Sequence, residues 1–440
     1  MAIKTSTHKL KRVLGVAFGI AVVVGGTIGV GILRTPSTIA AILPNAPLIL
    51  LCWVVIGLYI LLAASSYAEL TTMLPKAGGA YNYIKRAFGG YTGFLNGWFD
   101  FICNAIAPAY FCIVLSDYTA LLFPALKLYA SLVAILFLTL FTLINLPGIK
   151  SGSVAQQITS SLKVLLFLVL VAGCFFSGPV ESFQPAIAPV IKGGLLVAVF
   201  KSLQLIMGSY DGWMSASFFA EEDDNPDKNI PRSYLIGAIT VTIMYVLINA
   251  AILYVLPVGA AAKSTLAASE AARIAFGPGS TTLVIVIALF SLFSILNAYM
   301  LIPSRILFGL SRDGFFINLG ALVNKGGTPY FSLMFCYIIA LVLILISSFE
   351  QLFALAALMM TMVTGFSFAS LIWLRKKEPD LHRPYQAWGY PFSTWLALVI
   401  TIILFIGFAI SDRESLLIVI GLMIVSYPCF RLLVKQSSVI

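Results

Sequence analysis

The sequence predicts an all-α polytopic membrane protein with 12 transmembrane helices. Of its 440 residues, 60% are hydrophobic and only 10% are charged, whereas a soluble domain has about 25% charged residues. The hydrophobic residues form long runs, and about 20 apolar residues are enough to cross a bilayer. The hydrophilic stretches between the runs are too short for a second folded domain. We therefore expect a single transmembrane domain over residues 1–440.

The apolar runs give the expected position of each transmembrane helix. Most have about 20 to 30 residues, and the longer ones suit tilted or broken helices. In order, the twelve runs cover about residues 13–42, 47–73, 91–116, 128–148, 154–177, 193–220, 232–257, 279–310, 330–348, 351–374, 392–411 and 414–434.

The basic residues predict which side of the membrane each loop occupies. The net charge is +10, but lysine and arginine stand in short loops between the runs, so they indicate topology and not a nucleic-acid surface. With the N-terminus in the cytoplasm, the basic clusters at 4–12, 76–86, 305–325 and 375–383 all lie inside. We therefore expect a multi-pass protein of the plasma or inner membrane, in contact with lipid, with both termini cytoplasmic.

Cysteine and histidine patterns argue against enzyme and metal chemistry. The six cysteines stand singly, so neither a CxxC metal site nor a disulfide framework is expected. The two histidines, His8 and His382, lie in polar flanks, and the sequence contains no HExxH, P-loop or GxSxG pattern. We expect no enzymatic activity, no metal and no cofactor.

Four glycines in seven positions interrupt the first apolar run, between Gly25 and Gly31. Each glycine costs a helix about 1 kcal/mol relative to alanine, and broken backbone inside a membrane is tolerated only where it faces protein or a wet cavity. One interpretation is a break that marks a binding site. The alternative is an unbroken helix in which Gly25 and Gly29 form a GxxxG packing face.

The sixth run has a second interruption, from Gly208 to Trp213. Runs one and six cross the membrane in opposite directions, because an odd number of crossings separates them. Interrupted helices at matching positions of two inverted halves indicate the midplane binding site of a transporter. The pairing favours the interpretation of both interruptions as breaks.

At this point several motifs, spread in order over residues 25–391, become recognisable together. They are Gly29-Val30-Gly31-Ile32, Tyr67-Ala68-Glu69-Leu70, Pro75-Lys76-Ala77-Gly78-Gly79-Ala80-Tyr81, Tyr210-Asp211-Gly212-Trp213, Ala220-Glu221-Glu222, Arg312-Asp313-Gly314, Arg383-Pro384-Tyr385 and Gly389-Tyr390-Pro391. With them the chain resembles the amino acid–polyamine–organocation (APC) superfamily, and within it the L-amino acid transporter-like permeases.

The resemblance implies a fold and a transport activity. The fold is the LeuT-like one, with a first inverted repeat at 13–177, a second at 193–374, two extra helices at 392–434, and unwound spans 1 and 6. The activity is secondary active transport of amino acids by alternating access, through exchange or proton-coupled uptake. Alternatives are a transporter-like nutrient sensor and a carrier of polyamines or other amines. The expected partners are an amino acid substrate and, in the coupled case, a proton.

An amino acid needs donors for its carboxylate and acceptors for its ammonium group. The half-helix after Gly31 offers free backbone N–H groups and a positive dipole end, and the unwound carbonyls near Ile28 and Gly208 can accept hydrogen bonds. The predicted substrate-binding residues are Thr27, Ile28, Gly29, Val30, Gly31, Gly208, Ser209, Tyr210 and Asp211.

Two residues and one loop depart from the pattern of relatives. Val30 stands where many relatives have a serine, and Gly208 where many have a bulky aromatic residue. The loop from Asp117 to Lys127 lacks the cysteine that joins eukaryotic members to a heavy subunit. We therefore expect no disulfide-linked heavy subunit.

Lys163 is the predicted coupling residue. It lies ten residues beyond Ser153, which is about 15 Å of helix and close to the middle of a bilayer core of about 30 Å. In relatives, lysine at the matching position is associated with sodium independence, because its amine occupies the space of a sodium ion. Lys163 is accordingly expected to tie span 5 to the unwound part of span 1, with span 8 as a second candidate partner. The alternative is a lysine that only holds two helices together.

Other charged and aromatic residues have two readings each. Asp100 either faces the bundle interior or makes a structural hydrogen bond, and Asp211 either binds an ammonium group or caps free N–H groups. Glu69 is expected to be structural or part of an inner gate. Arg34 is a candidate for carboxylate binding or an outer gate, and Lys201 for snorkelling. The acidic residues from Glu221 to Asp224 are expected to form a solvated inner loop. Four aromatic residues are expected to lie at the membrane interface or to pack between helices: Tyr81, Tyr83, Trp98 and Trp213.

Overall fold

The computed structural model describes residues 10–29, 31–179, 194–264, 266–411 and 413–437. Within these ranges the chain forms helices and connecting turns, with no β-strand beyond an isolated bridge between Leu14 and Asp223. Ten of the described helical segments are long and apolar enough to cross a membrane, and two further apolar helices are shorter. The predicted all-α, multi-pass membrane architecture is therefore confirmed at this level.

The first half of the chain follows the predicted runs. Its helices are α1 (Val16–Thr27), α2 (Gly31–Ala40), α3 (Ala46–Met73), α4 (Tyr81–Phe88), α5 (Gly90–Leu122), α6 (Ala130–Asn145) and α7 (Ile149–Phe176), with a 3₁₀ turn, η1 (Pro124–Tyr129), between α5 and α6. The side chain of Asn45 accepts a hydrogen bond from the Leu48 N–H and so begins α3. Gly89, at φ +95°, provides the left-handed corner between α4 and α5.

The second half adds α8 (Gly194–Ser209), η2 (Ser215–Phe219), α9 (Pro226–Val255), α10 (Val258–Lys263), α11 (Ala267–Phe276), η3 (Pro278–Ser280), α12 (Thr281–Arg312), η4 (Asn318–Ala321), α13 (Tyr330–Ile346), α14 (Phe349–Lys377), α15 (Phe392–Ser411) and α16 (Arg413–Ser437). Helix α9 begins six residues before the predicted run because Pro226 starts it, a position where the missing N–H costs nothing. The alanine-rich α11 is not a simple surface helix, since Ala267, Ala268, Ala271 and Ala272 are buried.

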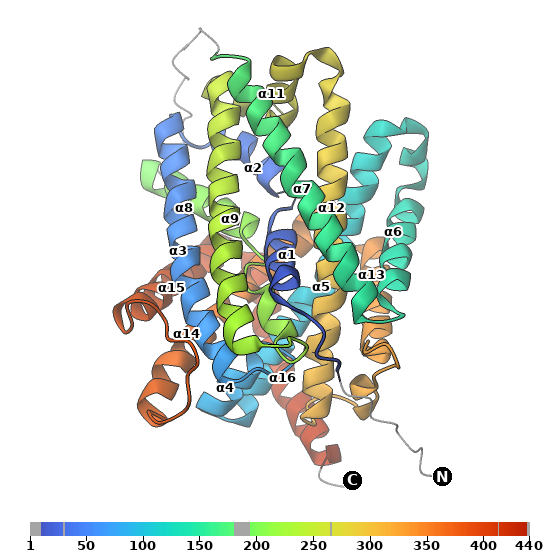
Figure 1. Ribbon diagram of the computed structural model, residues 1–440, viewed down its shortest axis with the longest axis vertical. Coiled ribbons are helices and arrows are strands. Elements are labelled where there is room, and N and C mark those ends of the chain that lie inside the picture. The colour runs from blue at the N-terminus through green and yellow to red at the C-terminus, as the bar shows by residue number, and fades with distance from the viewer. Residues whose placement is uncertain (1–9, 30, 180–193, 265, 412, 438–440) are drawn as a thin grey trace.

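Helix α1 lies in the centre of the molecule and packs against α7, α9 and α12 (Figure 1). Close approach to α9 depends on glycine. A Cβ atom at Gly237 would lie 2.5 Å from Cγ1 of Val23, and one at Gly19 would lie 2.0 Å from Oγ of Ser233. Small residues allow such contacts between membrane helices. The two long helices α5 and α12 also pack together and form the other wall of the interior.

The two ends of the molecule differ in what they carry. Helix α11 lies at the end toward which α2 runs, whereas α4 and the end of α16 lie at the opposite end (Figure 1). The chain enters α1 from that opposite end as well. On the predicted topology, the α4 end is cytoplasmic.

Candidate functional site

Both predicted helix breaks exist. Helix α1 ends at Thr27, Ile28 is extended at φ −71° and ψ 96°, and α2 begins at Gly31. Helix α8 ends at Ser209, and the chain then turns through Gly212 at φ +96°. The alternative of an unbroken first helix with a GxxxG face is wrong. Val30, also a predicted site residue, lies outside the described residues.

The two breaks touch each other. A Cβ atom at Gly212 would lie 2.4 Å from the carbonyl oxygen of Gly26, and one at Gly31 would lie 2.9 Å from Oγ of Ser209. Since both positions lack a side chain, the two irregular segments pack backbone to backbone. This contact places the start of α2 beside the end of α8.

Tyr245 of α9 joins the breaks. Its hydroxyl lies 2.8 Å from the carbonyl oxygen of Thr27 and 2.6 Å from that of Ser209, and these two acceptors share its single O–H hydrogen. The ring is fully buried and packs against Trp53 and Tyr210. Sequence reasoning missed this residue, because a tyrosine inside an apolar run carries no signal that it reaches two distant backbone carbonyls.

A cavity of about 310 Å³ lies between the breaks and the helices around them. Six of the predicted residues line it: Thr27, Gly29, Gly31, Gly208, Ser209 and Asp211. Arg34, Thr35 and Thr38 of α2, Tyr110, Phe111 and Val114 of α5, Leu205 of α8, Ile295 and Tyr299 of α12 and Phe353 of α14 complete the wall. The cavity thus extends from the breaks along α2, toward the end of the molecule that carries α11.

Three predicted residues are not in this lining. Ile28 and Lys163 are fully buried outside it. Tyr210 is also fully buried; its ring packs on Trp53 and its hydroxyl lies 3.5 Å from the Trp53 carbonyl oxygen. Tyr210 therefore supports the break from behind.

The amine of Lys163 sits on the carbonyls of the first break. It donates to the carbonyl oxygen of Gly25 at 2.8 Å and to that of Ile28. Oγ of Ser291, on α12, donates to the same Ile28 oxygen at 2.9 Å. The expected link from span 5 to span 1 is present, and span 8 joins it through Ser291. With both donors on it, the Ile28 carbonyl is not the acceptor for a substrate ammonium group that the sequence suggested.

Asp211 has the capping role that the sequence suggested, while its role toward an ammonium group stays a prediction. One oxygen accepts from the N–H of Gly212 at 2.9 Å, which caps the irregular segment. The other accepts from the hydroxyl of Tyr299 at 3.2 Å. The residue is also partly exposed to the cavity, so its carboxylate is available to a bound cationic group.

The start of α2 provides the donors expected for a carboxylate. The N–H groups of Gly31, Ile32 and Leu33 belong to its first turn and have no acceptor inside the helix. Arg34 follows, and its guanidinium lies 5.7 Å from the centre of the Tyr118 ring. A positive dipole end and an arginine at one cavity wall favour an anionic group there.

Ion pairs close the opposite end of the interior. Arg305 and Glu222 are both fully buried and meet at 2.9 Å, while Arg312 and Glu221 meet at 2.6 Å. Burial raises the pKa of Glu222, and the charge of Arg305 acts against that rise. The backbone N–H groups of Val13 and Leu14 bind the Glu222 carbonyl oxygen at 3.0 Å.

The prediction of a solvated loop from Glu221 to Asp224 is therefore wrong for Glu222 and Asp223, which are buried; only Asp224 is exposed. The physical reason is pairing. Arg305 satisfies Glu222, and Asn229 with the Asn225 N–H satisfies Asp223.

Glu69 also has a structural role at this end. It is fully buried, and it binds Arg375 at 2.6 Å, Arg383 at 3.3 Å and the Ala387 N–H at 2.7 Å. It thereby anchors the loop between α14 and α15 to α3. The aromatic residues Tyr81, Tyr83 and Trp213 are buried packing residues and not interfacial ones.

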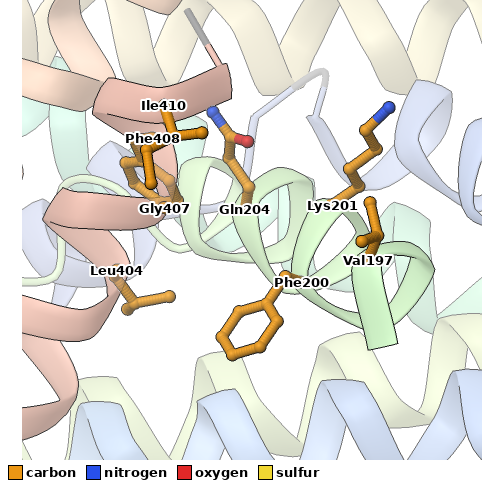
Figure 2. Close-up of a pocket in the computed structure, with 8 residues that line it drawn as sticks. All are labelled: Val197, Phe200, Lys201, Gln204, Leu404, Gly407, Phe408 and Ile410. Atoms are coloured by element: carbon orange, nitrogen blue, oxygen red, sulfur yellow. The ribbon is translucent and has the colours of Figure 1, made fainter. Parts of the chain in front are cut away.

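Lys201 lies away from the breaks. It lines a separate cavity of about 210 Å³ between α8 and α15, with Val197, Phe200, Gln204 and Phe408 among its neighbours (Figure 2). None of the predicted binding residues lines this cavity. The side chain of Lys201 is exposed, in keeping with the predicted snorkelling.

Comparison with known proteins places this architecture in a family. The profile described as "Amino acid permease" matches residues 14–427. The chain is 28% identical to the serine/threonine exchanger SteT of Bacillus subtilis, over 95% of this chain and 96% of that protein. It is 30% identical to the human large neutral amino acids transporter small subunit 2, over 86% and 72% of the two chains, and 29% identical to the mouse b(0,+)-type amino acid transporter 1, over 86% and 79%. The chain belongs to the amino acid permease family, a family of transporters and not of enzymes.

Proposed function

We propose that the protein is a sodium-independent secondary active amino acid carrier that works by alternating access. The observation that carries the proposal is the amine of Lys163 on the carbonyls of Gly25 and Ile28. Unwound carbonyls of this kind coordinate sodium ions in transporters with broken helices. The Lys163 amine in the same place fills the space that a sodium ion would take, so it excludes that ion sterically.

The proposed fold has twelve spans with both termini in the cytoplasm. The first inverted repeat, 13–177, corresponds to helices α1 to α7, and the second, 193–374, to helices α8 to α14, the last of which continues to Lys377. The additional segment, 392–434, corresponds to α15 and to α16, which continues to Ser437. The breaks after Thr27 and Ser209 support this division, because each interrupts the first helix of its repeat.

In the proposed binding mode the substrate carboxylate lies at the start of α2, near Gly29 and Gly31. The ammonium group faces Asp211 and Ser209 of the second break. The substrate side chain points toward Tyr110, Ile295 and Phe353, which line the rest of the cavity. Thr27 and Gly208 contribute to the walls, while Ile28 and Tyr210 hold the break in shape.

The structure supports an outward-facing state of the cycle. The cavity extends along α2, whereas the α4 end is closed by the pairs of Arg305 with Glu222 and Arg312 with Glu221. Release to the cytoplasm then requires these pairs to separate. The proposal includes no disulfide-linked heavy subunit, because the stretch from Asp117 to Lys127 contains no cysteine.

Uptake into proteoliposomes in sodium-containing and sodium-free buffer tests the proposal. Labelled neutral, cationic and acidic amino acids and a polyamine are each tried, with and without unlabelled substrate inside. We expect saturable uptake of amino acids that internal substrate stimulates and that does not depend on sodium. Lys163→Ala should lose most of this uptake, because the carbonyls of Gly25 and Ile28 lose their hydrogen-bond donor. Lys201→Ala is the matched control and should transport normally.

Several outcomes would contradict parts of the proposal. Strict sodium dependence of the wild type, or unaltered rate and affinity in Lys163→Ala, would remove the role of Lys163. Saturable binding without flux would indicate a sensor, and uptake of the polyamine alone would indicate an amine carrier.

A further inference from the structure

Asp100 of α5 is a buried acid that no mechanism so far uses. Its side chain is fully buried. One carboxyl oxygen accepts from the side-chain amide of Asn104, one turn along the helix, at 2.8 Å. The other oxygen, Oδ2, has no hydrogen-bond partner among the described residues. A buried polar atom without a partner is costly, so it needs an explanation.

Among the residues that the structure describes, no cation forms an ion pair with this carboxyl group. The ion pairs of the described chain use Glu69, Glu221, Glu222, Glu270, Asp313 and Glu378. Three basic side chains of the interior have other partners: Lys163 binds the carbonyls of the first break, Arg305 binds Glu222, and Arg375 binds Glu69. Burial of an unpaired carboxylate is so unfavourable that such a group takes up a proton instead.

The ionisable groups around Asp100 reinforce this conclusion. They are Tyr67 of α3, Tyr83 of α4, Cys103 on the same helix, and Asp211 of the second break. None of them is a base that becomes positively charged. Asp211 has hydrogen bonds from the Gly212 N–H and the Tyr299 hydroxyl, both of which stabilise its ionised form. Of two neighbouring acids, Asp100 is thus the one that keeps a proton.

Asp100 lies beyond the floor of the substrate cavity, on the side of the closed end. It is ten residues from Gly90, the first residue of α5, which is about 15 Å along the helix. Its neighbour Tyr67 packs edge-on against Trp213, two residues after Asp211, with ring centres 4.8 Å apart. Separation of the ion pairs at that end would open this region to the cytoplasm.

We propose that Asp100 is the proton-binding site of a proton-coupled uptake cycle. In the outward-facing state the carboxylate takes one proton from a hydronium ion of the outside solution: an O–H bond of hydronium breaks, one forms at Oδ2, and water remains. When the inner end opens, the same O–H bond breaks and the proton leaves to the cytoplasm. One proton therefore enters with each substrate molecule. This inference rests on the proposed carrier function.

The test uses the full chain in proteoliposomes with a trapped pH-sensitive dye. Substrate added outside should acidify the interior, and an imposed inward proton gradient should drive accumulation above equilibrium. In Asp100→Asn, accumulation should fall to the level seen without a gradient, since the amide cannot take up a proton. Asp100→Glu keeps the carboxyl group and should keep acidification, with its pH dependence shifted. Cys112→Ser, on the same helix and outside the cavity lining, is the control and should behave as the wild type.

Each outcome decides a different point. Wild-type counterflow without acidification would overturn the assignment of Asp100, and so would gradient-driven accumulation in Asp100→Asn equal to that of the wild type. If Asp100→Asn does not fold, acidification by the wild type together with an unshifted pH dependence in Asp100→Glu would also overturn it. Absence of counterflow with every amino acid would instead contradict the carrier function itself.

Discussion

Gly31 shows how one missing side chain determines the site. A Cβ atom there would lie 2.9 Å from Oγ of Ser209 and 3.2 Å from its Cα atom, whereas the nearest atom to a Cβ at Gly29 is Cδ1 of the Ile295 side chain, at 2.9 Å. A side chain end can rotate away, but a backbone atom cannot move without moving its helix. Gly31 is thus the stricter of the two glycines.

We therefore expect Gly31→Val to abolish substrate binding, because it separates the two breaks and blocks the start of α2. Gly29→Val should also abolish binding, and Gly29→Ala should retain part of it. Binding of a labelled amino acid to protein in detergent measures the effect, with elution as a single species showing that the variant folds. Gly279→Ala is the control, since nothing lies within 4 Å of its added Cβ atom. Normal affinity in Gly31→Val would refute the carboxylate site at the start of α2.

Gly208 is a second position where absence of a side chain has a consequence. Its added Cβ atom would lie 3.2 Å from Cζ of Phe353. The aromatic group that relatives place at this position thus has a counterpart here on α14. The cavity volume next to Gly208 is therefore limited by the ring of Phe353, a residue that the sequence did not indicate as part of the site.

Gly208→Phe should accordingly restrict transport to small amino acids, because the new ring and Phe353 compete for one part of the cavity. Phe353→Ala in the same chain should restore larger substrates. Competition of a panel of amino acids of increasing size against one labelled substrate measures the profile. An unchanged profile in Gly208→Phe would mean that residue 208 does not face the substrate.

Between elements, Tyr245 is the only described side chain whose hydroxyl reaches the backbone of both breaks. The carbonyls of Thr27 and Ser209 belong to segments that lack regular helical hydrogen bonds. Tyr245 therefore does more than fill space between α1, α8 and α9: it fixes the distance between the two halves of the site.

Tyr245→Phe should lower the stability of the protein by about 1–3 kcal/mol, the usual cost of leaving buried acceptors unsatisfied. It should also weaken substrate binding, since the breaks lose their common donor. Thermal unfolding in detergent with and without substrate measures both effects. Tyr59→Phe is a matched control, because its hydroxyl bonds Thr401 far from the cavity. Equal stability and affinity in the two variants would contradict the bridging role.

The helices and their breaks follow from local sequence, but the contacts at the breaks do not. Long apolar runs, Pro226 at a helix start and clustered glycines act through the backbone within a few residues, so sequence alone predicts them. The partners of Tyr245 and Glu222 depend on the packing of helices far apart in the chain. The link from Lys163 to the first break is expected only from the resemblance to a family. The same limit explains the error at Glu222. A run of acidic residues predicts a solvated loop, because the local sequence does not show that Arg305, 83 residues later, lies beside Glu222.

At the scale of the whole molecule, the α4 end contains an ion pair in which both side chains are fully buried. Arg305 meets Glu222 at 2.9 Å, and its guanidinium also lies 5.6 Å from the centre of the Phe219 ring. Removal of one partner of a buried ion pair costs about 3–5 kcal/mol, largely because the other charge is left unpaired. If the pair forms only while this end is closed, removal of one partner lowers the stability of the outward-facing state and leaves the inward-open state unaffected.

Glu222→Gln should then shift the protein toward an inward-open state. If the closed state loses only about 1.4 kcal/mol of stability relative to the open state, the open fraction rises about tenfold. A cysteine introduced by Ser217→Cys, at a buried position in η2, reports the opening in a chain whose six native cysteines are replaced. In inside-out vesicles, an impermeant maleimide should label it about tenfold faster when Glu222→Gln is present. Glu378→Gln, which removes the exposed pair with Arg86, should leave the rate unchanged. Equal labelling rates in the Glu222→Gln and Glu378→Gln chains would show that the buried pair stabilises the fold alone and does not hold the inner end closed.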